Sequence, residues 1–232
     1  MAGEYSKVAA GLTGKQSPNR DLAFLPADSP EGRRYVGAMN AAGNFAYANR
    51  QIMTTIARHN FRKAFGDAPL PLVYDVTHNM AKRETHGGQE LWVHRKGATR
   101  AFPPGRMRGT RYESIGQPVL IPGSMGTASY VLVGTEKAAE SLFSVNHGAG
   151  RRMSRTAATG RGRKGRRRQA AISDQRFRDS MKGIALICAD RSGAKEEAPD
   201  AYKDIDGVVR VVEGAGLADV VARLRPLAVL KG

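Results

Sequence analysis

A long helical period in the first third of the chain constrains the fold more than any other feature of the sequence. From Glu31 to Phe65 the pattern is helical, because a set of mostly apolar residues recurs at spacings of three and four, namely Tyr35, Met39, Ala42, Phe45, Ala46, Asn49, Met53 and Ile56. Ser29 and Pro30 come just before this stretch, and they suit the N-cap and the first helical position. We therefore predict one long helix here, after a polar, turn-rich segment over 1–28.

Beyond this helix the pattern changes to short runs rich in β-branched and aromatic residues, separated by Gly, Pro and Ser. These runs are LVYDV, LWVHRKG, PVLIPG, SYVLVG, SLFSV and GIALICAD. A further helical pattern over 204–212 leads to the apolar run LRPLAVL near the C-terminus. Because strands and helices do not alternate regularly, we predict an α+β fold, with a long N-terminal helix followed by mixed β structure.

The charge of the chain favours a polyanionic partner. Its 232 residues include 37 Lys and Arg against 21 Asp and Glu, which gives a net charge of +16. Basic side chains that neutralise phosphates release counterions, so nucleic acid is the favoured partner, although a membrane surface or an acidic protein would also be attracted. The stretch from Arg151 to Arg168 is especially basic, and we predict that its part over 159–168 is a mobile loop.

The composition argues against a membrane protein and a disulfide scaffold. The sequence has no apolar run of about 18 residues, which a spanning helix needs, and its first residues lack the apolar region of a secretory signal. Cys188 is the single cysteine, so no internal disulfide can form. We therefore expect a location in the reducing cytoplasm.

His147 is the first candidate for chemistry, because small residues and arginines follow it directly. Gly148, Ala149 and Gly150 would let backbone N–H groups approach a phosphate. The arginines beyond them could bind phosphate through bidentate hydrogen bonds. A neutral imidazole nitrogen can attack phosphorus and form a covalent intermediate. A turn histidine beside a solvated basic loop explains the same spacing equally well.

His78 is the second candidate. Together with Asp75, Glu84 and His86 it offers imidazole and carboxylate ligands that suit Mn, Zn or Fe. In a helix, His78 and His86 would lie two turns apart and could not share an ion. We therefore expect one metal ligand from this segment, with a polar amphipathic helix that binds no metal as the alternative.

The segment IPGSMGTASY is the third candidate, because its glycines and serines could offer backbone amides and hydroxyls to a nucleotide. It lacks the lysine of a Walker loop, so the pattern by itself is weak. Lys231 directly follows an apolar run, and from its position alone it is an ordinary terminal residue.

Taken together, seven segments resemble the RtcB family of GTP-dependent RNA ligases, in the order in which that family has them. The segments are SPEGRRYVGAMNAAGNFAYANRQ, HNMAKRETH, HRKGATRA, PGSMGTASY, HGAGRRMSRT, EAPDAYKDID and the terminal KG. The resemblance implies an enzyme that uses GTP and Mn²⁺ to join RNA 3′-phosphate or 2′,3′-cyclic phosphate ends to 5′-hydroxyl ends, as in tRNA splicing and RNA repair.

The resemblance also implies roles for individual residues. His147 matches the histidine that carries guanylate, and His78 matches a Mn²⁺ ligand. Arg151 and Arg155 match contacts with RNA or phosphate. A larger set matches the nucleotide site: Asn79, Pro122, Gly123, Ser124, Met125, Ser129, Gly148, Ala149, Gly150, Tyr202 and Lys231.

The sequence also departs from the family. Residues 1–232 resemble only the C-terminal portion of the ligase domain, and the N-terminal half would supply an Asp and Cys pair, a GNHF segment and another histidine for Mn²⁺. None of these is in the sequence. The implied partners are therefore RNA, a separate N-terminal half and an archease-like activator. The alternatives are a catalytically incomplete RNA-binding fragment and a basic structural protein.

Overall fold

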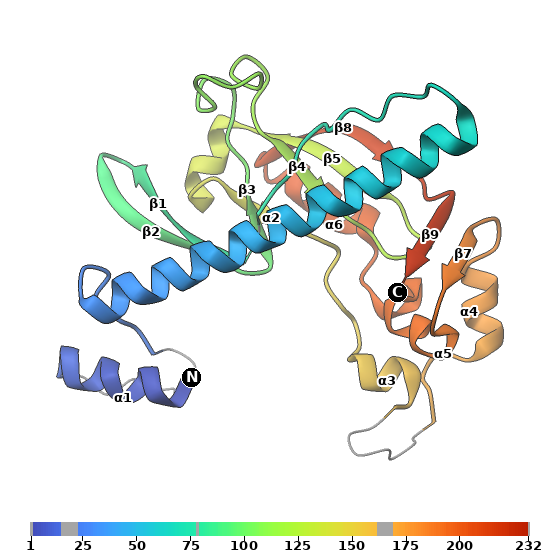
Figure 1. Cartoon of the computed structure of the whole chain (residues 1–232), viewed down its shortest axis with the longest axis horizontal. Coiled ribbons are helices and arrows are strands. Elements are labelled where there is room, and N and C mark those ends of the chain that lie inside the picture. The colour runs from blue at the N-terminus through green and yellow to red at the C-terminus, as the bar shows by residue number, and fades with distance from the viewer. Residues whose placement is uncertain (1, 15–22, 78, 162–168, 232) are drawn as a thin grey trace. The chain divides into compact units, whose positions relative to one another are not determined.

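The computed structural model of the chain describes residues 2–14, 23–77, 79–161 and 169–231, and the chain divides into two units, Met1–Thr77 and His78–Gly232. It contains helices and strands that do not alternate regularly, so the predicted α+β fold is confirmed (Figure 1). The predicted ligand His78 and residues 162–168 of the predicted mobile loop lie outside the described residues. At the start of that loop the prediction was wrong, because Thr159 ends a short helix and Arg161 pairs with Asp190 at 2.8 Å.

The first unit consists of helices α1 (Ala2–Thr13) and α2 (Pro30–Phe65) and the segment after them. The predicted cap of α2 is confirmed, because the Ser29 hydroxyl accepts a hydrogen bond from the Gly32 amide at 3.0 Å. The following segment returns along the helix, where Arg58 donates to the Leu70 carbonyl at 2.8 Å and Arg50 pairs with Asp75 at 2.6 Å.

Two sequence predictions for this unit were wrong. The run LVYDV over 72–76 is not a strand, because Arg50 and Arg58 of α2 hold the segment around it and none of the described residues in this unit forms a strand that could pair with it. Helix α1 was missed, because its small residues and its two glycines suggested a turn-rich segment and not a helix.

The second unit begins with an antiparallel hairpin of β1 (Met80–His86) and β2 (Gln89–Arg95). Gly87 and Gly88 join the strands, and both have positive φ, as a tight hairpin turn requires. The alternative of a polar helix after His78 is therefore wrong. Inward positions of β1 carry Glu84 and His86, both buried, so the strand period, not the helix period, describes this segment.

Strands from distant parts of the sequence make the remaining sheets. Short β3 (Ala98–Arg100) pairs with β6 (Ser144–Asn146), and β7 (Ala185–Cys188) pairs in parallel with β9 (Ala228–Lys231). The largest sheet has the order β4 (Pro118–Ile121), β5 (Ser129–Gly134) and β8 (Ala218–Leu224). Between them lie the short helices η2 (Glu136–Ser141), α3 (Arg155–Thr159), α4 (Asp174–Ser180), α5 (Arg191–Ala194), η4 (Lys195–Glu197) and η5 (Pro199–Ala201).

The main core forms where helix α6 (Ile205–Gly214) covers this three-stranded sheet (Figure 1). Its inward positions Ile205, Val209 and Val212 follow the helical spacing predicted for 204–212, and they pack against Ile121 and Leu132 of the sheet. Each such side chain contributes about 1.5–3 kcal/mol when buried. This core fixes the ends of β4, β5 and β8, from which the candidate site is built.

Two details of the strands differ from the prediction. In SLFSV, Leu142 and Phe143 have positive φ and make a turn, so the strand begins only at Ser144. Lys231, which was expected to be an ordinary terminal residue after an apolar run, is itself the last residue of strand β9, and its neighbour Leu230 is 78% exposed.

None of the helices in the described ranges combines the length and the apolar character that a bilayer crossing needs.

Candidate functional site

The loop between β4 and β5, residues 122–129, is shaped by its own hydroxyl groups. The Ser129 hydroxyl accepts from the Gly123 amide at 3.2 Å, and the Thr127 hydroxyl accepts from the Ser124 amide at 2.7 Å. A Cβ atom at Gly123 would lie 2.0 Å from the Ala128 carbonyl oxygen, so only glycine fits there. The serines and glycines that suggested a nucleotide loop therefore also determine its backbone conformation.

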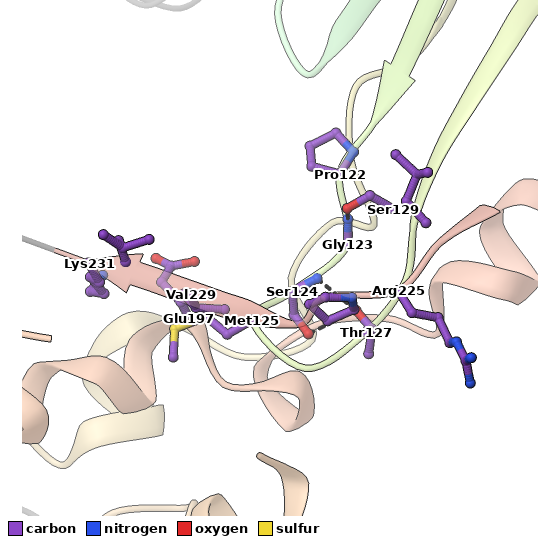
Figure 2. Close-up of a pocket in the computed structure, with 13 residues that line it drawn as sticks. Pro122, Gly123, Ser124, Met125, Thr127, Ser129, Glu197, Arg225, Val229 and Lys231 are labelled. Atoms are coloured by element: carbon purple, nitrogen blue, oxygen red, sulfur yellow. Dashed lines mark hydrogen bonds between the residues drawn. The ribbon is translucent and has the colours of Figure 1, made fainter. Parts of the chain in front are cut away.

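An open pocket of about 520 Å³ lies beside this loop. Figure 2 shows that the loop forms one part of its lining, while Glu197 and residues of β9 form another. Six residues that the resemblance assigned to the nucleotide site line it together: Pro122, Gly123, Ser124, Met125, Ser129 and Lys231. The volume lies within the range of small-molecule sites. Residues about one hundred positions apart in the sequence thus meet in one cavity.

His147 lies at the end of β6, next to a second group of predicted residues. Its backbone N–H donates to the Gly97 carbonyl at 3.3 Å, and the Gly97 N–H donates to the Asn79 side-chain oxygen at 3.3 Å. Asn79 has a φ of 59°, which asparagine tolerates better than most residues. Gly97 therefore connects the predicted guanylate carrier to the predicted nucleotide contact Asn79.

The Gly148–Gly150 segment connects this group to the pocket. A Cβ atom at Gly148 would lie 3.6 Å from the Pro122 carbonyl oxygen, so His147 and its glycines are adjacent to loop 122–129. Ala149 is buried in the main core, and Gly150 turns with a φ of 73°. The Gly150 carbonyl accepts from the Lys203 amide, which joins the segment to the chain after Tyr202.

Asn146, directly before His147, is a polar residue that the sequence did not single out. Its side-chain nitrogen donates to the Gly148 carbonyl at 2.8 Å, while its side-chain oxygen is buried and has no hydrogen-bond partner among the residues that the structure describes. A buried acceptor without a partner costs about 1–3 kcal/mol. The oxygen is therefore a free acceptor beside the candidate nucleophile.

Arg151 makes internal contacts with its whole guanidinium group. It donates to the carbonyls of Met153 at 3.0 Å and Glu196 at 2.6 Å and to the Tyr202 hydroxyl at 2.8 Å, and it stacks on the Tyr202 ring. Arg155 is different, because its side chain is 66% exposed and lies 3.7 Å from the carboxylates of Glu196 and Glu197. Of the two predicted phosphate contacts, Arg155 is thus the accessible one.

Tyr202 is not among the residues that line the 520 Å³ pocket. Its hydroxyl donates to Glu197, which does line the pocket. Burial raises the pKa of the Tyr202 hydroxyl, and the neighbouring Glu197 carboxylate raises it further. Tyr202 therefore stays protonated at neutral pH and donates a hydrogen bond to a residue of the pocket lining.

The metal ligands that the sequence suggested do not gather in the described part of the chain. Asp75 is paired with Arg50, and Glu84 and His86 contact each other below the β1–β2 hairpin. Across the described residues there is no group of three or more His, Cys, Asp or Glu side chains that could hold a metal ion. These residues therefore do not make a Mn²⁺ site by themselves.

A buried charged network around Glu84 was missed by the sequence reasoning. Arg95 binds both carboxylate oxygens of Glu84, at 2.7 and 2.8 Å, and His86 lies 3.0 Å from the same carboxylate. Burial by itself would raise the pKa of Glu84, but the hydrogen bonds from Arg95 and His86 outweigh it, so the pKa is lowered. The available signal was the strand alternation, which places all three side chains on the inward face of the hairpin.

Comparison with known proteins agrees with the resemblance in the sequence. The family model described as tRNA-splicing ligase RtcB matches residues 1–232. The chain is 51% identical to the tRNA-splicing ligase RtcB of Pyrococcus furiosus over all of its own length and 24% of the relative's. It is 48% identical to the protein of that name from Thermococcus kodakarensis, over all of its own length and 49% of the relative's.

A third relative, the tRNA-splicing ligase RtcB of Nanoarchaeum equitans, is 47% identical over the whole chain and 49% of its own length. The chain therefore spans between about a quarter and about half of the length of these relatives. It belongs to the RtcB family of tRNA-splicing ligases and corresponds to a C-terminal portion of them.

Proposed function

We propose that this chain is the nucleotide-binding part of an RNA ligase that carries guanylate on His147. The observation that supports it best is the adjacency of two groups of residues. The pocket of loop 122–129 and Lys231 lies beside the Gly148–Gly150 segment, with a would-be Gly148 Cβ only 3.6 Å from the Pro122 carbonyl. A nucleotide in this pocket would have its phosphates near His147.

The proposed chemistry starts with attack of a His147 imidazole nitrogen on the α-phosphorus of GTP. A P–N bond forms while the bond to the departing pyrophosphate breaks. The guanylate then passes to an RNA 3′-phosphate, and attack by a 5′-hydroxyl joins the two ends and releases GMP. Backbone amides of the Gly148–Gly150 segment would stabilise charge on the phosphates.

RNA would be bound mainly through its phosphates, because the net charge of +16 suits an electrostatic interface. The exposed Arg155 is the first phosphate contact that we propose, and Arg151 would act mainly by fixing Tyr202 and the segment after His147. The RNA ends of tRNA splicing or of RNA repair are the proposed substrates, and the cytoplasm is the proposed location.

Mn²⁺ is expected from the family, but the described residues of this chain do not form a group of donors that could hold it. This mismatch favours a second candidate function, in which the chain binds RNA and nucleotide but needs a separate N-terminal polypeptide to act. An archease-like activator is a further proposed partner.

The test is transfer of label from α-³²P-labelled GTP to the chain in the presence of Mn²⁺, with and without an N-terminal polypeptide of the family. We expect an acid-labile adduct that His147→Ala abolishes. His94→Ala is the matched control, because His94 is exposed on the outer face of β2, and it should be labelled like the wild-type chain. No adduct under either condition would contradict the ligase function, and an adduct only with the added polypeptide would support the second candidate.

A further inference from the structure

Three ionisable side chains form a hydrogen-bonded network on the buried face of the β1–β2 hairpin. Glu84, His86 and Arg95 are 8%, 9% and 6% exposed, and the Arg95 guanidinium grips the Glu84 carboxylate with two hydrogen bonds. Burying such charges is costly unless every donor and acceptor finds a partner. Each guanidinium nitrogen of Arg95 has an acceptor, and two of its hydrogen bonds leave the hairpin.

These outward contacts reach the turn before β6. The Arg95 Nε donates to the Ser144 hydroxyl at 2.8 Å, and its Nη2 donates to the Leu142 carbonyl at 2.9 Å. Leu142 has a φ of 51°, so this turn is held in a conformation that leucine rarely adopts. Three residues after Ser144, the chain arrives at His147.

Arg95 is also close in the structure to Asn79 and Gly97, the two residues that are linked to His147 by hydrogen bonds. It pairs across the hairpin with Met80, the residue after Asn79. Two residues beyond it lies Gly97, whose carbonyl accepts from the His147 amide and whose amide donates to Asn79. Arg95 therefore joins two parts of this site: its guanidinium holds the turn before β6, which leads to His147, and its backbone lies between the segments that carry Asn79 and Gly97.

We propose that Arg95 and Glu84 are positioning residues that fix His147 and Asn79 relative to each other. This rests on the proposed guanylate transfer, and neither side chain is required to touch the nucleotide. Arginine suits the task because its planar fork can bind a carboxylate, a hydroxyl and a carbonyl at once, whereas lysine offers a single point charge. Arg95→Lys keeps the charge but loses this geometry.

The first experiment measures amide hydrogen exchange in the whole chain. In Arg95→Lys we expect the Gly97 and His147 amides to exchange at least tenfold faster, while the Ser124 amide in the pocket loop stays within twofold of wild type. Arg176→Lys is the matched control, since Arg176 makes an exposed two-bond pair with Asp200 in the same unit. Equal acceleration of all amides, or none at Gly97 and His147, would overturn the proposal.

The second experiment follows labelling by GTP with the N-terminal polypeptide present. We expect the labelling rate of Arg95→Lys at saturating GTP to fall at least tenfold, with the half-saturating GTP concentration within twofold. A changed half-saturating GTP concentration with an unchanged labelling rate at saturating GTP would contradict a positioning role. Glu84→Gln keeps the volume of the side chain, and it is the variant to use if Arg95→Lys does not fold; the same pattern is expected from it.

The two experiments separate two kinds of failure. If the wild-type chain forms no adduct at all, the proposed function fails. The exchange rates at Gly97 and His147 still decide whether Arg95 holds these residues together.

Discussion

Replacing Gly123 by alanine should damage the pocket by a predictable amount. The new Cβ would lie 2.0 Å from the Ala128 carbonyl oxygen and 2.6 Å from the Thr127 hydroxyl oxygen, whereas real Cβ atoms essentially never approach within 3.0 Å. The nearest atom belongs to the backbone of Ala128 and cannot turn away as a flexible side chain would. The backbone of the loop must therefore move by about 1 Å. Overpacking of this kind costs about 1–3 kcal/mol.

The displacement should also break the hydrogen bond from the Gly123 amide to Ser129, which contributes about 1 kcal/mol. We expect Gly123→Ala to lower the free energy of unfolding by about 2–4 kcal/mol, the sum of these two effects. Since the moved loop lines the pocket, GTP affinity of the folded chain should fall at least about tenfold, which corresponds to about 1.4 kcal/mol. Urea unfolding and titration with a fluorescent GTP analogue measure the two quantities.

Gly134→Ala is the control that separates the two effects. A Cβ there would lie 2.1 Å from the Ala101 carbonyl oxygen, so its clash is as severe as that at Gly123, but Gly134 does not line the pocket. It should destabilise the fold similarly while the folded chain keeps its GTP affinity. Gly214→Ala meets no atom within 4 Å and should leave both quantities nearly unchanged. The reasoning is refuted if Gly123→Ala binds GTP as tightly as Gly134→Ala does.

Three further substitutions test other parts of the structure. Tyr202→Phe removes the hydroxyl that donates to Glu197 and accepts from Arg151, and it should lower the free energy of unfolding by about 1–2 kcal/mol in urea, because both charged groups lose a partly buried partner. Asp204→Ala removes the N-cap of α6 and should cost about 1 kcal/mol in the same assay, and a cost near zero would contradict this role of Asp204. The lowered pKa of Glu84 means that its ionised form stabilises the fold above about pH 4.3, its ordinary value, and that this contribution is lost as the pH falls through the lowered pKa. The stability difference between wild type and Glu84→Gln, followed by urea unfolding from pH 7 to pH 3, should therefore shrink with falling pH, and a constant difference would refute this origin.

Elements with a clear period could be predicted from the sequence. Helices α2 and α6 were predicted because one face of each repeats at helical spacing, and β4 and β5 because short apolar runs ended at Gly and Pro. The run LVYDV is also short and apolar, like β4 and β5, but it is not a strand. Strand formation needs a partner strand, and the sequence does not show whether one is near.

The site could be predicted only in pieces. Loop 122–129 and His147 stood out because glycine, serine and histidine cluster there, and the resemblance added Lys231. Their meeting depends on the parallel pairing of β7 with β9 and on the antiparallel pairing of β3 with β6, both of which join distant segments. A single sequence does not encode such pairings in any local pattern.

The buried pair of Glu84 and Arg95 was unpredictable for a different reason. Charged residues are almost never fully buried unless they are paired, and the sequence does not show which residue would pair with Glu84, which it suggested only as a metal ligand. The partner that makes burial possible lies eleven positions away, across the hairpin, and further acceptors lie at Ser144 and Leu142. Only the three-dimensional structure brings these groups together.

The pocket lies entirely within one unit of the chain, whereas metal donors do not gather among the residues that the structure describes there. Its lining comes from loop 122–129, Glu197 and residues 224–231, all within the unit His78–Gly232. The metal donors do not gather in the described residues of that unit. We therefore expect this chain to bind GTP without Mn²⁺, whereas the rate at which it forms the proposed His147 adduct should rise when an N-terminal polypeptide of the family is added.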